Sequence, residues 1–440
     1  MSSLDFNSYA RQAVRRNRDR RAKAKALPLA LIILPLCFLS PVDFSFYIQD
    51  FRLDAYRLAL FAFFVPALAR ASSDRAISLN LFDFGVLAYA VWIVLALIYH
   101  MGVGQGLESG GIVALETIAP YLIARAYLTD LDRLQRFLRF LIFLSLVVAS
   151  IMIIEMIAGR NLVRIISSAL MGSENPVGEI GRFGLVRARG PFTHPIHAGV
   201  MAGGLLAIHW LTNPQTFRRW LIALIMGFGV FASVSSGPFL MFLSQMGLLI
   251  YNKIAIRLRL PKHWLLLTGA GVALIVVLEI GSNRGAVLFL VQNLAFNAWT
   301  GFYRMLQWEY GSAEVLRNPI WGIGFGDWLR PSWMRMNSSI DAFWLVTAMR
   351  YGLPALLLLV SSIVLIWKKI VVRLAKDADS QLRKISLAWL IVFFSWCFVG
   401  FTVHFWSHTY VFFCLLLGVG AAIADLKIGK SAPRVRGAVN

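Results

Sequence analysis

Long apolar segments recur along most of the chain. From about residue 27 onward, apolar runs of about 17 to 25 residues alternate with polar connections, and this length matches one crossing of a bilayer's hydrocarbon core. Open sheet edges do not survive in hydrocarbon, so each run is expected to be an α-helix. The pattern predicts an all-α integral membrane protein, a bundle of about twelve transmembrane helices. The expected spans are residues 27–48, 54–70, 81–99, 111–127, 137–158, 193–211, 220–235, 237–251, 264–281, 341–367, 385–403 and 406–424.

Two polar segments, residues 159–192 and 282–340, are much longer than the other connections. Long loops carry function more often than short ones. Within the second, residues 302–316 mix apolar and polar positions at helical spacing, which predicts a short helix lying along the membrane surface. We therefore expect one transmembrane domain, residues 27–425, that carries two long outer loops.

Charge gives this domain an orientation. Only 15% of the 440 residues are charged, against roughly a quarter in soluble proteins, yet the net charge is +21. In a soluble chain such an excess would suggest nucleic acid, but here the basic residues gather in particular connections and in two tails, residues 1–26 and 426–440. Basic segments stay in the cytoplasm, so both tails are expected there and no nucleic-acid partner is expected. Alternation then makes the connections at residues 70–76, 125–136, 212–219, 252–263 and 368–384 cytoplasmic as well.

The two outer loops contain arginine but no lysine, whereas every lysine falls in a segment predicted to be cytoplasmic. Long loops escape the positive-inside rule, so some of these arginines will be ordinary surface residues. Lysine would serve on a surface equally well, however, and arginine is preferred where a planar, bidentate donor must hold phosphate or carboxylate. The pattern favours an anionic ligand on the outer face. The ten arginines are Arg160, Arg164, Arg182, Arg187, Arg189, Arg284, Arg304, Arg317, Arg330 and Arg335.

The segment RARGPFTHPIHAG, residues 187–199, concentrates this chemistry at the start of an apolar run. A proline suits the first turn of a helix, so Thr193 or His194 is expected to cap the span, with its unpaired amides directed outward. Arg187 and Arg189 approach that helix end, which itself attracts anions.

Two histidines follow these arginines. His194 and His197, at i and i+3, share a helical face. Without carboxylates nearby they are a weak metal signal, and hydrogen bonding to a substrate or to the neighbouring loop is the favoured interpretation.

Two features of the second loop are candidates for chemistry. The glycines of WGIGFGDW, residues 321–328, resemble a nucleotide loop, but no strand precedes them, so tight turns or a close backbone approach to substrate are expected instead. Asp341 stands where the chain re-enters the membrane. It is either a helix cap or a carboxylate that can act as a general base.

These stretches resemble the bacterial O-antigen polymerase and ligase superfamily, in particular its exopolysaccharide polymerase-like members. The matching segments are RARGPFTHPIHAG (187–199), SVSSGPFL (233–240), YRMLQWEYGSAEVLRNPIWGIGFGDW (303–328) and DAFWLVTAMRYGLP (341–354). Their order and their places relative to spans and loops carry the resemblance.

The resemblance implies a GT-C-type architecture in the bacterial inner membrane and a metal-independent, inverting glycosyltransferase that needs no cofactor. Such enzymes take glycan from undecaprenyl diphosphate and hold the diphosphate with arginines on the periplasmic side. Arg187, Arg189 and Arg304 match that role. Membrane lipid, and a chain-length regulator or export proteins, are the further partners that the resemblance suggests.

The sequence departs from the ligases of this family at two places. They show a Ser-Arg-Gly-like sequence where this chain has Ser235, Ser236 and Gly237, so one expected phosphate-binding arginine is replaced, and Arg284 is the candidate substitute. They also place a histidine where this chain has Asp341. Both departures favour a polymerase over a ligase.

Three functions stay open from the sequence. A polymerase would join lipid-linked repeat units, a ligase would move finished glycan to another acceptor, and a flippase would carry lipid-linked oligosaccharide across the membrane. Flippases line a central path with charges inside their spans, whereas here the charges concentrate in outer loops, with Glu155 and Glu279 near the outer ends of their spans. Surface chemistry is therefore favoured over translocation.

Overall fold

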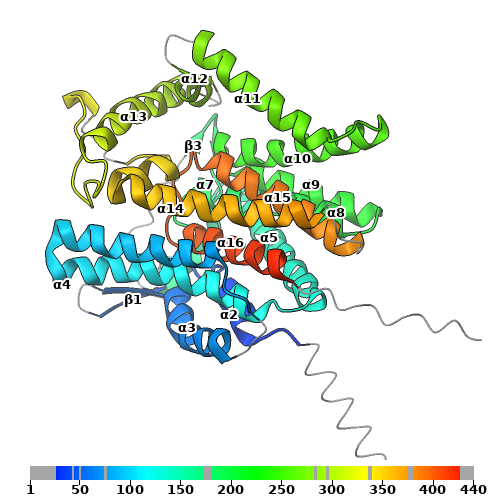
Figure 1. Ribbon diagram of the computed structural model, residues 1–440, viewed down its shortest axis with the longest axis horizontal. Helices are drawn as coiled ribbons and strands as arrows, with labels where there is room; N and C mark the ends of the chain where they lie inside the picture. The colour runs from blue at the N-terminus through cyan, green and yellow to red at the C-terminus, as the bar shows by residue number, and fades with distance from the viewer. Residues whose placement is uncertain are drawn as a thin grey trace, which may run out of the picture.

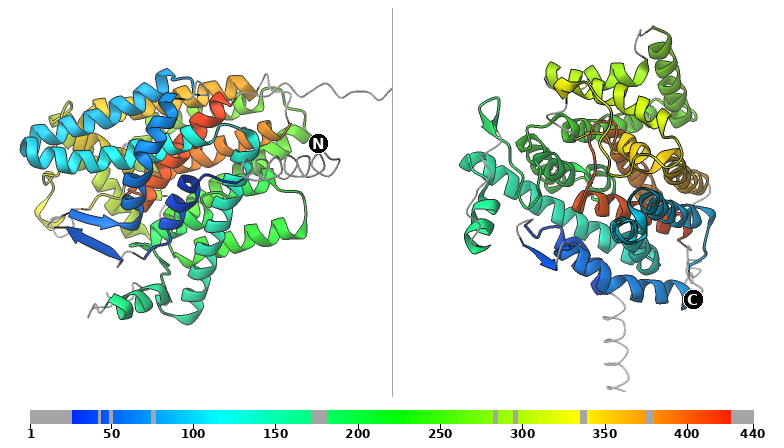
Figure 2. Two further views of the ribbon diagram at one scale, coloured as in Figure 1. Left: turned by 90° about the horizontal axis from the view of Figure 1, so that it is seen from below. Right: turned by 90° about the vertical axis from the view of Figure 1, so that its left-hand side faces the viewer.

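The computed structural model describes residues 26–41, 44–48, 51–73, 77–171, 181–281, 285–293, 297–334, 339–374 and 380–426. Within these ranges the chain is mainly helical, and its strands form two short antiparallel hairpins (Figures 1 and 2). Strand β1 (Ser45–Ile48) pairs with β2 (Phe51–Asp54), and β3 (Gly181–Arg182) pairs with β4 (Leu185–Val186).

Eight of the helices in the described ranges are long and apolar enough to cross a membrane, which agrees with the predicted all-α membrane class. These eight are α3 (Ala55–Ser73), α4 (Leu81–Tyr127), α5 (Leu131–Ala158), α10 (Ser236–Arg257), α11 (His263–Gly281), α14 (Phe343–Leu374), α15 (Ser380–Val399) and α16 (His408–Asp425). The others are α2 (Leu29–Cys37), α6 (Leu162–Met171), α7 (Pro195–Gly203), α8 (Leu206–Thr212), α9 (Phe217–Ala232), α12 (Ala286–Asn293), α13 (Ala298–Arg317) and the 3₁₀ turn η1 (Ser332–Met334).

Helix α16 forms the centre of the bundle (Figure 1). Its residues are buried without interruption from His408 to Ala424, with α4, α14, α15 and α7 packed around it. Two glycines permit this packing, because a Cβ on Gly418 would collide with the backbone of Tyr121, and one on Gly420 with the ring of Trp389. Helix α11 is the opposite case, with no buried residue, and lies at the edge of the molecule.

The long helix α4 is a hairpin of two arms. Gly102 leaves the helical conformation, at φ 76° and ψ 170°, and the chain turns back on itself there. Gly106 then lies against the backbone of Ile98, and Gly110 against Val94. The two arms correspond to the two spans predicted at residues 81–99 and 111–127.

The span predicted at residues 193–211 is broken into α7 and α8, and a buried side chain closes the break. Gln245 of α10, fully buried, donates from Nε2 to the carbonyl oxygen of Gly203 (3.1 Å) and accepts the amide of Ala207 at Oε1 (3.0 Å). Trp396 of α15 donates to the carbonyl oxygen of Gly204 (3.2 Å). Backbone groups freed by the break are thus paired within the bundle, as an apolar environment requires.

Helix α14 is broken as well, at Gly352 (φ 80°), and here a loop closes the break. The amide of Leu353 donates to the carbonyl oxygen of Pro319 (2.7 Å), and the amide of Ile323 donates to that of Met349 (2.7 Å). The segment after α13 is therefore hydrogen-bonded directly onto the backbone of α14.

The glycines of residues 321–328 serve this contact. Gly324 donates its amide to the carbonyl oxygen of Arg350 (3.0 Å), which Pro354 cannot pair because proline has no N–H. Gly322 and Gly324 have φ values of 67° and 58°, and a Cβ on Gly322 would collide with the backbone of α14. The close approach predicted for these glycines is made to a helix of the protein itself.

The structure allows the bounds of two predicted helices to be checked. The single helix expected over residues 27–48 is wrong, because α2 ends at Cys37 and the chain enters β1 at Ser45. Pro35 and Pro41 explain this end, since proline cannot donate within a helix and clashes with the preceding turn. The helix expected at residues 302–316 is confirmed as α13, and its position along the membrane surface stays a prediction. The count of twelve crossings and the sidedness of the loops stay predictions.

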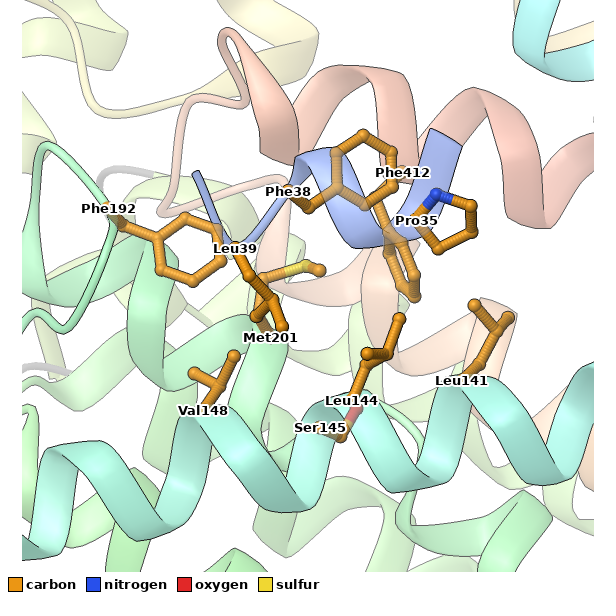
Figure 3. A pocket seen from close by; sticks show the side chains of 10 residues that line it. All are labelled: Pro35, Phe38, Leu39, Leu141, Leu144, Ser145, Val148, Phe192, Met201 and Phe412. Atoms are coloured by element: carbon orange, nitrogen blue, oxygen red, sulfur yellow. The ribbon is translucent and has the colours of Figure 1, made fainter. Parts of the chain in front are cut away.

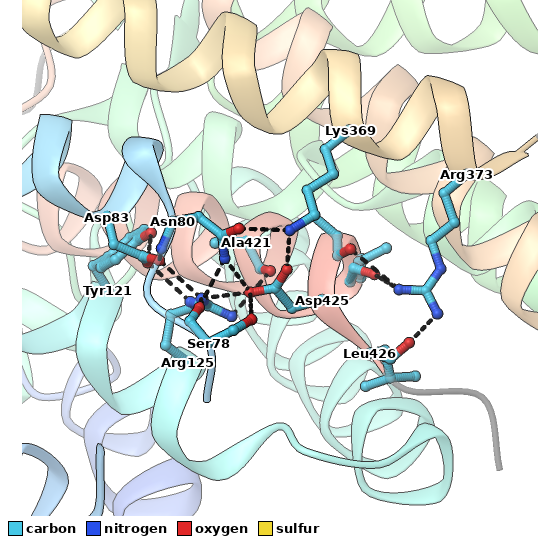
Figure 4. A network of polar contacts seen from close by, with 12 residues as sticks. Ser78, Asn80, Asp83, Tyr121, Arg125, Lys369, Arg373, Ala421, Asp425 and Leu426 are labelled. Atoms are coloured by element: carbon cyan, nitrogen blue, oxygen red, sulfur yellow. Dashed lines mark hydrogen bonds and ion pairs between the residues drawn. The ribbon is translucent and has the colours of Figure 1, made fainter. Parts of the chain in front are cut away.

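A network of ion pairs ties four helix ends together at one end of the bundle (Figure 4). Arg125, in the second arm of α4, donates from Nε and Nη2 to the two carboxylate oxygens of Asp83 (2.9 Å each) and from Nη2 to Asp425 of α16 (2.6 Å). Lys369 of α14 pairs with Asp425 and donates to Asn80 (2.7 Å). All these groups adjoin segments predicted to be cytoplasmic.

Arg125→Ala should lower the free energy of unfolding by roughly 3–5 kcal/mol, because it leaves two carboxylates with less compensation in a buried site. The Arg125 side chain is only 3% exposed. Thermal unfolding of the purified protein in one detergent measures the effect. Arg139→Ala, at an exposed position of α5, is the matched control and should change stability by less than about 1 kcal/mol. Equal melting curves for both variants would contradict a stabilising network.

Candidate functional site

The arginine-rich segment predicted from the sequence forms a fixed turn between β4 and α7. Gly190 adopts φ 50°, and Pro191 follows it. His194 is the N-cap of α7, accepting the amide of Ile196 at Nδ1 (3.2 Å), and Pro195 occupies the first helical position. Of the two caps expected, His194 is confirmed.

A buried carboxylate holds this turn in place. Glu155, near the end of α5 and fully buried, accepts the amides of Arg189 (3.0 Å) and Gly190 (2.9 Å) at Oε2. Its Oε1 accepts the amide of Val163 at the start of α6 (3.1 Å). Glu155 was a candidate for a charge along a transport path, and the structure uses it to satisfy backbone donors.

The turn is also anchored by an aromatic side chain. Phe192 is 4% exposed and points among apolar side chains of α2, α5 and α7 (Figure 3). The space left there is only about 10 Å³, with an almost wholly apolar lining, too small for more than about one water molecule. The packing of Phe192 and the hydrogen bonds of Glu155 therefore fix the backbone of the turn that carries the neighbouring arginines.

Arg187 is directed toward the corner between α9 and α10. Its Nη2 donates to the hydroxyl of Ser235 (2.6 Å), and its Nε donates to the carbonyl oxygen of Ser233 (3.2 Å). The amide of Ala188 also donates to the carbonyl oxygen of Ala232 (2.9 Å). The serine segment, where the ligases that the sequence resembles have an arginine, thus receives an arginine from the preceding loop.

Arg304 reaches the same corner from α13. It is 4% exposed, and its Nη1 donates to the hydroxyl of Ser236 (3.3 Å). One turn further along α13, Gln307 donates to the carbonyl oxygen of Ser339 (2.8 Å) and accepts the amide of Asp341 (3.2 Å). Helix α13 therefore carries both an arginine and the residue that positions the Asp341 backbone.

Asp341, Arg187 and Arg304 form one electrostatic cluster. Burial raises the pKa of Asp341 above its ordinary value of 3.8, and the charges of Arg304 and Arg187 oppose that rise. Burial, then the charge of Arg182, lowers the pKa of Arg187 to about 10, although Asp341 opposes the shift. Arg187 keeps its charge at neutral pH, so the cluster holds more positive than negative charge.

His194 lies beside this cluster as a neutral ring. Burial, followed by the charges of Arg187 and Arg189, lowers its pKa to about 4. A neutral imidazole at this place offers hydrogen bonds without adding a further cation.

The structure describes the predicted site residues other than Arg284, and it places them in different surroundings. Arg187 and Arg304 donate to adjacent serines, the backbone of Asp341 is held one turn along α13 from Arg304, and His194 caps the helix that follows the arginine turn. Arg189 is buried beside His194 and is held through its amide by Glu155, but its charge is not among those that shift the pKa of Asp341.

His197 and Arg284 complete the set. His197 turns to the connection between α15 and α16, where its ring pairs through Nε2 with the carbonyl oxygen of His404 (3.0 Å) and packs on Trp406 at 3.8 Å between centroids. It contacts the neighbouring loop, one of the two roles expected for it. Arg284 lies outside the described residues.

Sequence reasoning missed the residues that position the others. Glu155 was visible as an acid inside an apolar run, a costly placement that demands a partner. Gln307 stands three residues after Arg304, and therefore on the same helical face. No local pattern pairs Ser235 with Arg187 or Ser236 with Arg304, because these contacts join segments 48 and 68 residues apart. In the described ranges, no group of three or more His, Cys, Asp or Glu side chains is placed to hold a metal ion.

Comparison of the chain with protein-family models finds no matching family, and comparison with curated proteins finds no significant match. The family resemblance rests on the residues quoted above.

Glu155→Ala should speed hydrogen exchange at the amides of Arg189, Gly190 and Val163 by roughly tenfold or more, because a buried donor without a partner costs about 1–3 kcal/mol. Hydrogen–deuterium exchange with mass spectrometry follows peptides over these residues. Glu108→Ala, at an exposed position of α4, is the matched control. Unchanged protection of the turn in Glu155→Ala would show that Glu155 does not hold it.

Proposed function

We propose that this protein is a membrane glycosyltransferase that polymerises undecaprenyl-diphosphate-linked repeat units into exopolysaccharide or O-antigen on the outer face of the bacterial inner membrane. The observation that carries the proposal is that Arg187 and Arg304, from segments far apart in the sequence, donate to two adjacent serines. Gln307, one turn after Arg304 on α13, accepts the backbone amide of Asp341 and so holds that acid at the same helix. A cationic cluster around one acid suits a reaction in which an anionic leaving group departs while a hydroxyl loses its proton.

The arginines act on the diphosphate. Arg187 and Arg304 are anchored on Ser235 and Ser236 and are buried, so their charges are fixed before substrate arrives. Guanidinium groups form paired, charge-assisted hydrogen bonds with phosphate oxygens. As the bond from the anomeric carbon to the diphosphate oxygen breaks, the bonding electrons move onto that oxygen, and fixed cations stabilise the growing charge.

Asp341 acts on the acceptor. An acceptor sugar hydroxyl attacks the anomeric carbon from the face opposite the diphosphate, forming the new glycosidic bond with inversion. Its proton passes to the Asp341 carboxylate and then to water. Burial raises the pKa of this carboxyl, which makes the carboxylate a stronger proton acceptor than an exposed aspartate.

Buried charged side chains on the helices already have partners within the protein, which supports an enzyme over a flippase. Glu155 holds backbone amides, Glu116 pairs with Arg57 (2.8 Å), and Arg125 pairs with Asp83 and Asp425. A transport path needs charges that can exchange partners with a cargo. A ligase would use the same grip, and the aspartate at position 341 favours the polymerase.

Arg187→Lys and Arg304→Lys should each lower the rate of polymer formation by roughly 10- to 100-fold, because lysine keeps the charge but cannot make the bidentate contact. The assay uses purified protein with an undecaprenyl-diphosphate-linked repeat unit. Arg160→Lys, exposed in the same outer segment, is the control and should keep the wild-type rate. Full activity in both cluster variants would rule out the diphosphate grip at this site.

Asp341→Asn should lower the rate by roughly 10²- to 10⁴-fold, as expected when a positioned base is removed. Asp341 stands two residues before the start of α14 and is therefore not its cap, and asparagine keeps the size, so an unchanged melting temperature is expected. The same assay, run with a chelator and without nucleotide sugar, measures this. In the wild type, kcat/KM should fall as pH falls through the raised pKa of Asp341, because only the carboxylate accepts a proton. A wild-type rate in Asp341→Asn would place the base elsewhere.

A further inference from the structure

A polar cavity that begins one residue from Asp341 along the chain is not used by the chemistry above. Its volume is about 630 Å³, within the roughly 300–1,000 Å³ typical of small-ligand sites. Its walls come from the glycine-rich segment, the first turns of α14 and the connection before α16. The side chains that matter are Phe325, Trp328, Arg350 and His404.

The cavity is held open by contacts in its own walls. The glycine-rich segment is hydrogen-bonded to the break in α14, as described above. Arg330 braces the far side: its guanidinium pairs with Asp327, donates to the carbonyl oxygen of Trp328 (3.0 Å) and lies 5.0 Å from the centroid of the Trp328 ring. The shape is therefore preformed rather than created by a ligand.

The lining combines aromatic faces with hydrogen-bonding groups. The Arg350 guanidinium lies 5.1 Å from the centroid of the Phe325 ring, and that ring is 46% exposed. Burial, then the charge of Arg350, lowers the pKa of His404 to about 3, so its ring is neutral. Its Nδ1 is buried and has no hydrogen-bond partner in the described part of the chain. Aromatic faces pack on the C–H faces of sugars, and planar or neutral polar groups bond their hydroxyls.

The cavity also adjoins the reacting centre. Ser339 and Ile340 line it, and the next residue is Asp341, whose carboxylate interacts with Arg304 and Arg187. Consecutive Cα atoms are only about 3.8 Å apart. The cavity wall therefore ends one residue before Asp341.

We propose that this cavity binds the acceptor saccharide, the one whose hydroxyl attacks, and that Phe325, Arg350 and His404 contact its terminal sugars. The inference rests on the proposed function, because it gives the acceptor a place distinct from the diphosphate of the donor. The donor glycan is the competing occupant. If the cavity binds the acceptor, changes in its wall raise the KM for the acceptor; if it binds the donor glycan, they raise the KM for the donor.

The test measures saccharide binding apart from catalysis. The full chain in lipid nanodiscs is titrated with short oligosaccharides released by partial hydrolysis of the polymer of its host, and binding is followed by saturation-transfer difference NMR. Phe325→Ala and Arg350→Ala should weaken binding at least about tenfold, or about 1.4 kcal/mol, because each removes a contact made by the cavity wall. Phe228→Ala on the exposed face of α9, and Arg160→Ala, are the matched controls and should bind as the wild type does.

Two further measurements distinguish this inference from the proposed function. Binding of undecaprenyl diphosphate without glycan should be unchanged in the cavity variants, and in the transfer assay the KM for the acceptor should rise while kcat is retained. Wild-type oligosaccharide binding in Phe325→Ala and Arg350→Ala, or a rise in the donor's KM instead, would overturn the acceptor site. Failure of the wild type to bind undecaprenyl diphosphate would overturn the proposed function, and the oligosaccharide titration would still report on the cavity.

Discussion

Broken helices within an apolar bundle must find partners for the backbone groups that each break frees, and the rest of this structure depends on how that is done. In the first break, a single amide side chain, Gln245, bridges Gly203 and Ala207. In the second, a whole loop takes the place of the missing helical turn at Gly352. The hydrogen bonds at this second break fix the segment after α13 to the bundle and give the cavity beside it a rigid wall.

Burying several arginines near one another is costly, and the site meets that cost with fixed partners. Arg187 and Arg304 reach hydroxyl and carbonyl oxygens at one helix corner, and Asp341 supplies a single opposing charge. Under the proposed function, the remaining positive charge would be balanced by the diphosphate of the substrate. Anchoring of this kind fixes the charges before any ligand binds, so little reorganisation is needed afterwards.

The sequence predicts what depends on local pattern and leaves open what depends on distant contacts. Apolar run lengths were enough for the membrane class, and helix-capping chemistry was enough for a helix start at Pro195, although it left Thr193 and His194 as alternative caps. The early end of α2 could have been anticipated from its prolines. The pairing of Glu155 with the arginine turn could not, because a carboxylate inside an apolar run has the same pattern whether it serves transport or holds amides.

The burial of α16 has a consequence for how the protein is assembled. Of the helices in the described ranges it is the last along the chain, yet it fills the middle of the bundle. Helices synthesised earlier must therefore leave a space open in the membrane, bordered by surfaces that only Gly418 and Gly420 allow a later helix to approach closely. Until that helix enters, the ion pairs around Asp425 cannot close. Entry of α16 and closure of the bundle are thus the same event.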